Sequence, residues 1–176
     1  MKIILLDVMS LDGKLTRWKD SPASDWASPE DSAYFLKVIR QSKLLVMGSN
    51  TFAINRPKPE KERLRIVMTR EPEKYQKLAI PGQLEFTGET PKQLVKRLEK
   101  AGFKQMLLVG GQKLAMAFFR ENLIDEFRVT IEPRIFGKGA SLIEEVELDL
   151  RLQLFSFEKL NEQGTLLLKY YVRKSI

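Results

Sequence analysis

The sequence contains no cysteine and no histidine. The absence of cysteine excludes disulfides, thiolate nucleophiles and metal sites with cysteine ligands, and we expect no bound metal. The absence of histidine excludes a Ser-His-Asp triad and removes the side chain that serves most often as a general base. Chemistry in this protein must therefore come from carboxylates, lysines, backbone dipoles or a bound cofactor that brings its own reactive group.

Long hydrophobic runs are also missing. The apolar stretch at the N-terminus, Ile3 to Leu6, ends at Asp7 and has no small-residue cleavage site, so it is typical of a first strand rather than of a signal peptide. A bilayer-spanning helix would need about 20 apolar residues. With 176 residues, 43% of them apolar and 30% charged, the chain has an ordinary globular composition. We expect one domain over residues 1–176, a cytoplasmic location and no membrane partner.

The net charge of +7 would be compatible with nucleic-acid binding. However, the basic residues are dispersed among acidic ones, as where Lys61 and Arg63 alternate with Glu60 and Glu62. This pattern favours a solvated surface, and we expect no nucleic-acid partner. A mildly positive field would also help to capture a polyanionic cofactor or a phosphorylated substrate.

Hydrophobic periodicity and turn residues divide the chain into alternating strands and helices. The expected strands are Ile3 to Met9, Leu44 to Met47, Arg65 to Thr69, Leu84 to Phe86, Met106 to Val109, Phe127 to Glu132, Arg151 to Glu158 and Thr165 to Arg173. The expected helices are Pro29 to Ser42, a short turn from Asn50 to Asn55, Thr90 to Ala101, and one that follows Gly110-Gly111 and ends at about Glu121. The stretches Arg17 to Pro29 and Asn55 to Glu62 are expected to be loops, and the length of the first suggests a functional one.

Buried apolar strands joined by helices predict a parallel sheet. Asn161 to Gly164 supplies a turn between the last two strands, which predicts a closing hairpin. We therefore expect a three-layer α/β protein whose central sheet is mostly parallel and ends in a C-terminal antiparallel hairpin.

The end of one buried strand has the features of an anion site. A strand that ends in two glycines and leads into a helix presents free backbone N–H groups and a positive dipole end, to which a pyrophosphate can come close. Taken alone, the pattern fits a plain strand–helix turn equally well. The residues concerned are Val109, Gly110, Gly111, Gln112, Lys113 and Leu114.

Two further strands end in residues that suit an anion. Thr69 and Arg70 follow one of them, and the other leads into Gly48, Ser49, Asn50 and Thr51. Because the carboxyl ends of parallel strands meet at one edge of a sheet, the three strand ends together predict one ligand across that edge.

Several motifs, taken with their order and spacing, resemble one superfamily. The first set is Ser10-Leu11-Asp12-Gly13-Lys14, Gly110-Gly111, Asp125-Glu126, and Pro133 with Gly137 and Gly139. The second set is Trp26 to Phe35 with Pro29 and Asp31, Met47 to Phe52, and Thr130. The first set is similar to the reductase domain of bacterial riboflavin biosynthesis, the RibD C-terminal domain, here in a stand-alone form. The second set is similar to dihydrofolate reductase, so the chain resembles the dihydrofolate-reductase-like superfamily over nearly its whole length.

The resemblance implies an NADPH-dependent reductase that transfers a hydride to a pterin or an aminopyrimidine. The substrate would be either dihydrofolate-like or the phosphoribosyl-aminopyrimidine of riboflavin biosynthesis. NADPH would lie along the three strand ends, with Arg70 facing its 2′-phosphate. Asp31 would hold the amino-pyrimidine edge through two parallel hydrogen bonds, and Thr130 would brace Asp31. The family also implies a homodimer.

Four further residues have roles by the same resemblance. Trp26 would close over the site from the long loop, and Phe35 would line the substrate. Lys14 would bind a substrate oxygen or phosphate. Arg63 lies near the position at which dihydrofolate reductases bind the glutamate tail of a folate.

The same residues also have purely structural interpretations. Asp31 could be an ordinary first-turn acid of a helix, and Trp26 could simply be packed in the core. Lys14 could be a solvated turn residue, and Arg70 could pair with Glu71 or Glu73. Asp125-Glu126 is best interpreted as a structural connection between a helix and a strand.

The sequence departs from the family pattern at three places. Ser49 stands where dihydrofolate reductases have an arginine for the 2′-phosphate, so the preference for NADPH rests mainly on Arg70. Val109 stands where riboflavin-pathway enzymes usually carry a glutamate, and no arginine follows Pro29 before Arg40. These departures count against the phosphoribosyl substrate. The alternative function is a non-catalytic nucleotide- or pterin-binding module on the same fold.

Overall fold

The computed structural model describes residues 1–18 and 21–173, so positions 19 and 20 of the predicted loop at Arg17 to Pro29 lie outside the described residues. The strands are β1 (Lys2–Ser10), β2 (Leu44–Gly48), β3 (Leu64–Met68), β4 (Leu84–Thr87), β5 (Gln105–Val109), β6 (Glu126–Glu132), β7 (Arg151–Lys159) and β8 (Leu166–Arg173). The α-helices are α1 (Pro29–Gln41), α2 (Ser49–Asn55), α3 (Pro91–Lys100) and α4 (Gln112–Arg120), and the 3₁₀ helices are η2 (Ala23–Asp25) and η3 (Pro72–Leu78).

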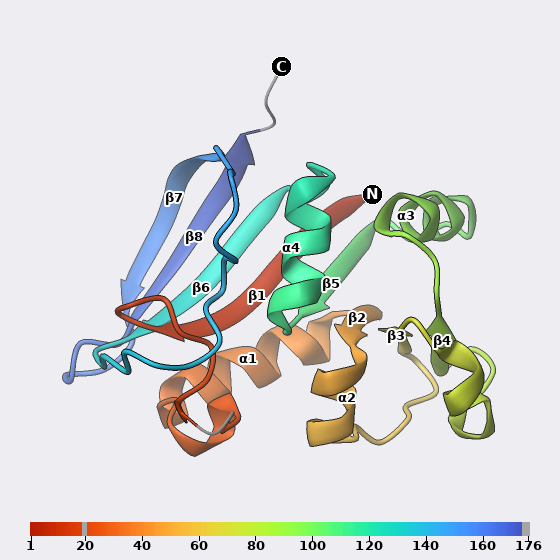
Figure 1. Cartoon of the computed structure of the whole chain (residues 1–176), viewed down its shortest axis with the longest axis horizontal. Helices are drawn as coiled ribbons and strands as arrows, with labels where there is room; N and C mark the ends of the chain where they lie inside the picture. The colour runs from red at the N-terminus through yellow and green to blue at the C-terminus, as the bar shows by residue number, and fades with distance from the viewer. Residues whose placement is uncertain (19–20, 174–176) are drawn as a thin grey trace.

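One eight-stranded sheet forms the centre of the described structure (Figure 1), and its strand order is β4-β3-β2-β5-β1-β6-β8-β7. Along this order, the neighbouring strands β4, β3, β2, β5, β1 and β6 all run parallel to one another. Strand β8 is antiparallel to both β6 and β7, so the hairpin joins the sheet through its second strand and β7 forms the outer edge. The predicted fold class is confirmed.

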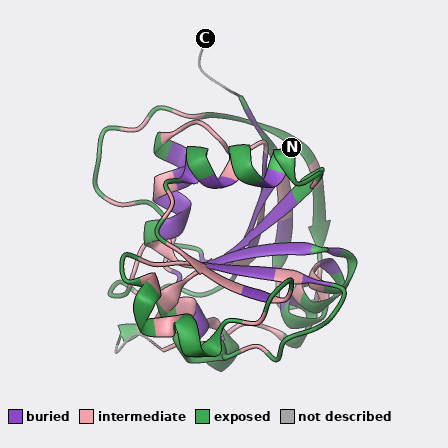
Figure 2. Ribbon diagram, turned by 90° about the vertical axis from the view of Figure 1, so that its right-hand side faces the viewer, coloured by how far each residue is buried: buried purple, intermediate pink, exposed green. Residues whose placement is uncertain are grey.

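Helices cover both faces of this sheet, which gives the three predicted layers. Ile3 and Leu5 of β1 pack in one buried cluster with the apolar sides of α3 and α4. Ile4 and Leu6 point to the other face and pack in a second cluster with α1 and α2. Figure 2 shows the buried strands between helices whose outer surfaces are exposed. We call the two sides the α4 face and the α1 face.

The helix N-termini follow the predicted capping pattern. Ser28 Oγ accepts a hydrogen bond from the Asp31 backbone N–H at 3.2 Å, and Pro29 occupies the first turn of α1. Thr90 and Gln93 form a reciprocal capping box at α3. Helix η3 forms in a stretch for which the sequence predicts no helix. Among the described residues, no helix is both long enough and apolar enough to cross a membrane.

The helical connections between strands pass from one face of the sheet to the other beside β1. Helix α1 leads from β1 to β2 on one face, whereas α4 leads from β5 to β6 on the other face. Pairing between β1 and β5 ends at Leu6 and Val109, but β1 continues along β6 as far as Ser10. Beyond Leu6, β1 therefore has no strand partner on its β5 side. Ligands of open α/β sheets bind at such a switch point, outside the carboxyl ends of the strands.

Candidate functional site

The structure brings the three predicted strand ends together. In the sheet register, Gly48 lies opposite Met68, and β5 is the next strand beyond β2. Thr51 also contacts the turn after β5, because a Cβ atom added to Gly111 would lie 3.3 Å from Thr51 Oγ1. Gly111 has φ of 95°, a conformation that favours glycine. Residues from α2 and from the β5–α4 turn therefore form one continuous surface at the carboxyl edge of the sheet.

The N-terminus of α4 has the properties predicted for a pyrophosphate site. No side chain caps it, so its first backbone N–H groups remain available to a ligand. The side chains of Val109 and Leu114 are buried in opposite core clusters, which leaves only their backbone for the site. Gln112 is half-buried and Lys113 is exposed, so these two side chains can reach a ligand.

Arg70 is available for a second anionic group. It is exposed directly after β3, and its side chain forms no hydrogen bond or ion pair within the described residues. Glu71 pairs instead with Lys74 at 2.5 Å, so the alternative pairing of Arg70 with Glu71 is not observed. Ser49 is half-buried and Asn50 is exposed on the same side of the sheet edge.

Asp31 is a buried carboxylate, with 7% of its surface exposed, in the first turn of α1. Its burial raises the pKa from 3.8 to about 6. Contact with the Thr130 side chain lowers this pKa, and the negative charge of Glu132 raises it again. Thr130 lies on β6 beside Val8 of β1, so the predicted pair of Asp31 and Thr130 comes together at the switch point.

Several buried polar atoms near Asp31 have no hydrogen-bond partner within the described residues. They are Oδ2 of Asp7, Nε1 of Trp26 and Oγ1 of Thr130. Buried polar groups in native proteins are nearly always hydrogen-bonded, so each exception needs an explanation. These atoms belong to β1, to β6 and to the loop before α1.

Glu132 positions the start of α1, although the sequence does not single it out as a site residue. One carboxylate oxygen accepts a hydrogen bond from the Ser28 backbone N–H, and the other accepts one from Thr165 Oγ1, both at 2.7 Å. The residue is 3% exposed. It thereby links β6, the hairpin and the helix that carries Asp31. An acid at the end of a buried strand was the only sequence signal.

Trp26 is 3% exposed, and its ring packs edge-on against Phe136 with the ring centroids 5.0 Å apart. Trp26 lies next to the start of α1 and its ring is part of the core, so the predicted closing role stays a prediction. Phe35 is half-buried on α1 and packs against the cluster on the α1 face.

Two predicted site residues have structural partners instead. Lys14 donates a hydrogen bond from Nζ to Ser141 Oγ at 2.8 Å, so its ammonium group has a partner in the segment after β6. Arg63 is buried before the start of β3, at the opposite edge of the sheet from Gly110. Its Nε donates to the backbone carbonyl of Ser42 at 2.8 Å, and Nη1 pairs with Glu60 at 2.5 Å. The structure therefore gives both side chains protein partners, and the ligand roles predicted for Lys14 and Arg63 stay predictions.

The motif Ser10 to Lys14 has a structural role as well. Asp12 accepts hydrogen bonds from Ser10 Oγ at 2.6 Å and from the backbone N–H groups of Phe136 at 3.1 Å and Gly137 at 2.8 Å. The Ser10 hydrogen bond, together with the two backbone ones, lowers the pKa of Asp12 to about 2. The motif fastens the segment after β6 to the end of β1.

Asp125 and Glu126 agree with their structural interpretation. The Asp125 carboxylate accepts a hydrogen bond from the Ile3 backbone N–H at 2.8 Å. Glu126 forms ion pairs with Lys2 and with Arg128. Both residues tie β6 to its neighbours at the end of the strands away from the candidate site.

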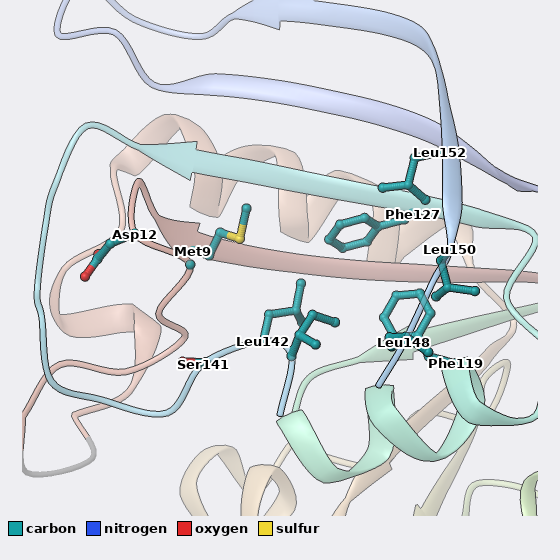
Figure 3. Close-up of a pocket in the computed structure, with 11 residues that line it drawn as sticks. Met9, Asp12, Phe119, Phe127, Ser141, Leu142, Leu148, Leu150 and Leu152 are labelled. Atoms are coloured by element: carbon teal, nitrogen blue, oxygen red, sulfur yellow. The ribbon is translucent and has the colours of Figure 1, made fainter. Parts of the chain in front are cut away.

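Two cavities lie near these elements. One, of about 470 Å³, is mostly apolar, and Figure 3 shows Met9, Phe127 and Leu142 pointing into it on the α4 face. No residue of the predicted site lines it. The other, of about 650 Å³, is more polar and is bordered by Trp26 and Glu132 at the start of α1.

Comparison with known proteins agrees with this geometry. A family model described as the RibD C-terminal domain matches residues 1–166. The chain belongs to the RibD C-terminal domain family. The predicted resemblance is thereby confirmed.

Relatives of this RibD C-terminal domain include proteins of similar length and longer ones. The uncharacterized protein YwjB of Bacillus subtilis is 24% identical over 98% of each chain. The riboflavin biosynthesis protein RibD of Aquifex aeolicus is 25% identical over 96% of this chain and 58% of that protein. A putative riboflavin biosynthesis protein from Shewanella has the same fold, with a TM-score of 0.80 over 98% of this chain and 99% of that one, at 21% identity.

Proposed function

We propose that this RibD C-terminal domain is an NADPH-dependent reductase that transfers a hydride to a pterin or an aminopyrimidine. The observation that carries the proposal is Asp31, a buried carboxylate beside the switch point whose surroundings include unpartnered polar atoms. A buried carboxylate without an ion pair is costly for folding, so it suggests a functional role. A ligand edge with two adjacent N–H groups would satisfy both of its oxygens.

The residues at the sheet edge fit a dinucleotide with a 2′-phosphate. The uncapped N-terminus of α4 and the glycine turn before it suit the pyrophosphate. Arg70, exposed and without a partner within the described residues, suits the 2′-phosphate. When bound, NADPH would supply the hydride that no side chain of this chain can supply. The chain itself would bind both ligands and hold the reacting groups together.

Asp31 would both orient the substrate and share a proton with it. Its pKa of about 6 lies close enough to neutral pH for the carboxyl group to exchange a proton with a ring nitrogen. Thr130 and Glu132 would hold it in place, the first by contact with the carboxylate and the second by fixing the start of α1.

The test combines cofactor binding with turnover. Wild-type protein is titrated with NADPH, and dihydrofolate and the riboflavin-pathway aminopyrimidine are then offered as substrates while NADPH absorbance is followed. Asp31→Asn is expected to keep NADPH affinity within about threefold and to lower turnover at least about a hundredfold. An Asp31→Asn variant as active as the wild type would contradict the proposal.

The second candidate is a non-catalytic nucleotide- or pterin-binding module. The engagement of Lys14 with Ser141 favours it, because it removes one predicted polar group from the site. This candidate predicts saturable cofactor binding without turnover of any pterin or aminopyrimidine. The substrate screen above therefore separates the two candidates.

We further propose that a second copy of the chain is the protein partner. Strand β7 is the outer edge of the sheet, and Leu152, Leu154 and Phe157 on it are 43%, 46% and 73% exposed. Long apolar edge strands are normally covered, since they otherwise promote aggregation. Analytical ultracentrifugation is expected to show a dimer in the micromolar range, and a monomer at about 100 µM would refute this.

A further inference from the structure

Asp7 is a half-buried acid on the central strand β1, and the proposed reaction gives it no role so far. Its neighbours along the chain, Leu6 and Val8, are buried apolar residues of the same strand. Oδ2 of Asp7 is fully buried and has no hydrogen-bond partner within the described residues. The Asp7 carboxyl group does not cap α4, which has no side-chain cap among the described residues. A buried carboxylate oxygen without a hydrogen-bond partner lowers stability, so it needs an explanation outside the folded chain alone.

The position of Asp7 in the sheet is that of the switch point. Pairing between β1 and β5 ends at Leu6 and Val109, so Asp7 is the first β1 residue without a β5 partner, next to Gly110. Side chains alternate along a strand, and Ile3 and Leu5 point to the α4 face. Asp7 therefore also points to that face, on which α4 has its N-terminus. Asp31 lies on the other face, yet its charge still raises the pKa of Asp7.

This arrangement places Asp7 between the two halves of the proposed site. The anion site at α4 is on one side of β1, and the substrate carboxylate Asp31 is on the other. A cofactor whose phosphates lie at α4 and whose reacting ring meets a substrate held by Asp31 must pass the unpaired edge of β1. In that arrangement, the group beside Asp7 would be the ring end of the cofactor, which bears a carboxamide.

We propose that the Asp7 carboxyl group binds the carboxamide of the nicotinamide ring through two parallel hydrogen bonds. This inference rests on the proposed function. A neutral carboxyl has one O–H donor and one carbonyl acceptor, and a primary carboxamide offers the complementary acceptor and donor. Burial raises the pKa of Asp7 to about 7, with a smaller contribution from Asp31, so the carboxyl group is largely protonated at and below neutral pH.

The test compares Asp7→Asn with Asp7→Leu, two replacements of similar size. The asparagine side chain still has a donor and an acceptor, so its NADPH Kd should stay within about threefold of wild type. The leucine side chain has neither, and its NADPH Kd should rise about tenfold or more, as expected for lost hydrogen bonds. Affinity for an ADP fragment that carries the 2′-phosphate but no nicotinamide should be the same in all three proteins, because Asp7 does not contact that half.

Thermal unfolding without ligand is the second readout. Asp7→Leu removes an unpartnered buried polar group, so its Tm should be equal to or above that of the wild type while its NADPH binding is weaker. A merely structural carboxyl would give a lower Tm and unchanged NADPH affinity. If the leucine variant does not fold, Asp7→Ala takes its place in the same titrations, with the same expected loss of NADPH affinity.

The outcomes separate this inference from the function on which it rests. Wild-type protein that fails to bind NADPH would overturn both. NADPH binding that Asp7→Leu or Asp7→Ala retains at wild-type strength would overturn the role of Asp7 alone. Equal weakening toward NADPH and toward the ADP fragment would also overturn it, since the affected contact would then not be the carboxamide.

Discussion

Replacing Asp31 by asparagine is expected to stabilise the protein above about pH 6 while it lowers turnover at least about a hundredfold. Burial raises the pKa of Asp31 from 3.8 to about 6 in the folded state. The folded protein therefore binds more protons than the unfolded chain between about pH 4 and pH 6, and its stability falls as the pH rises through this window. Above about pH 6 both states are ionised, so the loss stays constant. Asparagine cannot ionise, and the variant escapes this loss.

The size of the expected stabilisation follows from the pKa shift of Asp31. A rise of about two pKa units corresponds to about 3 kcal/mol, at about 1.4 kcal/mol per unit. Structural relaxation and water entry reduce such values, so we expect a gain of about 1–2 kcal/mol in the free energy of unfolding at about pH 8 and almost none at about pH 4. Asp7 titrates in the wild type and in Asp31→Asn alike. Subtracting one free energy of unfolding from the other therefore removes most of the contribution of Asp7.

Urea unfolding followed by tryptophan fluorescence at about pH 4 and pH 8 measures this difference. Asp149→Asn, at an exposed position outside the site, is the control and should change stability equally little at both pH values. A difference between wild type and Asp31→Asn that does not grow with pH would refute the assignment of Asp31 as a buried, functionally retained acid.

Three further results are expected. Arg70→Gln should raise the Kd for NADPH about tenfold and leave that for NADH unchanged in fluorescence titrations; equal effects on both would show that Arg70 does not bind the 2′-phosphate. Gly139→Ala should lower the free energy of unfolding by more than about 2 kcal/mol in urea, because its Cβ would lie 1.9 Å from the Thr16 carbonyl oxygen; unchanged stability would contradict that contact. Glu132→Gln should leave NADPH affinity unchanged but weaken substrate binding, measured as KM, because the start of α1 loses a charge-assisted hydrogen bond from Ser28.

Much of the fold could be predicted because local signals agree with the tertiary structure. The buried strands were recognisable as apolar runs, and α1 and α3 have caps and N-terminal prolines that the sequence shows directly. The strand order could not be derived from these signals, since it depends on which strands pair over long distances. The 3₁₀ helix η3 has only Pro72 as a local signal and was missed.

The positions of candidate site residues could be predicted where a motif lies at a strand end. The contacts of individual side chains were harder to predict. Gly110, Thr51 and Asp31 lie where the sequence placed them because strand ends and helix starts fix their backbone. Lys14 and Arg63 have partners that are distant in sequence or in the sheet, Ser141 and the Ser42 carbonyl, and no local pattern reveals these. Asp7 looked like the end of an apolar run, although the structure places it at the switch point.

The central claim is that the switch point beside Asp31 binds NADPH. Isothermal titration calorimetry of the wild-type protein with NADPH, at low ionic strength and neutral pH, tests it most directly. We predict saturable one-to-one binding per chain with a Kd below about 1 mM. A titration that shows no saturation at millimolar NADPH would contradict the account.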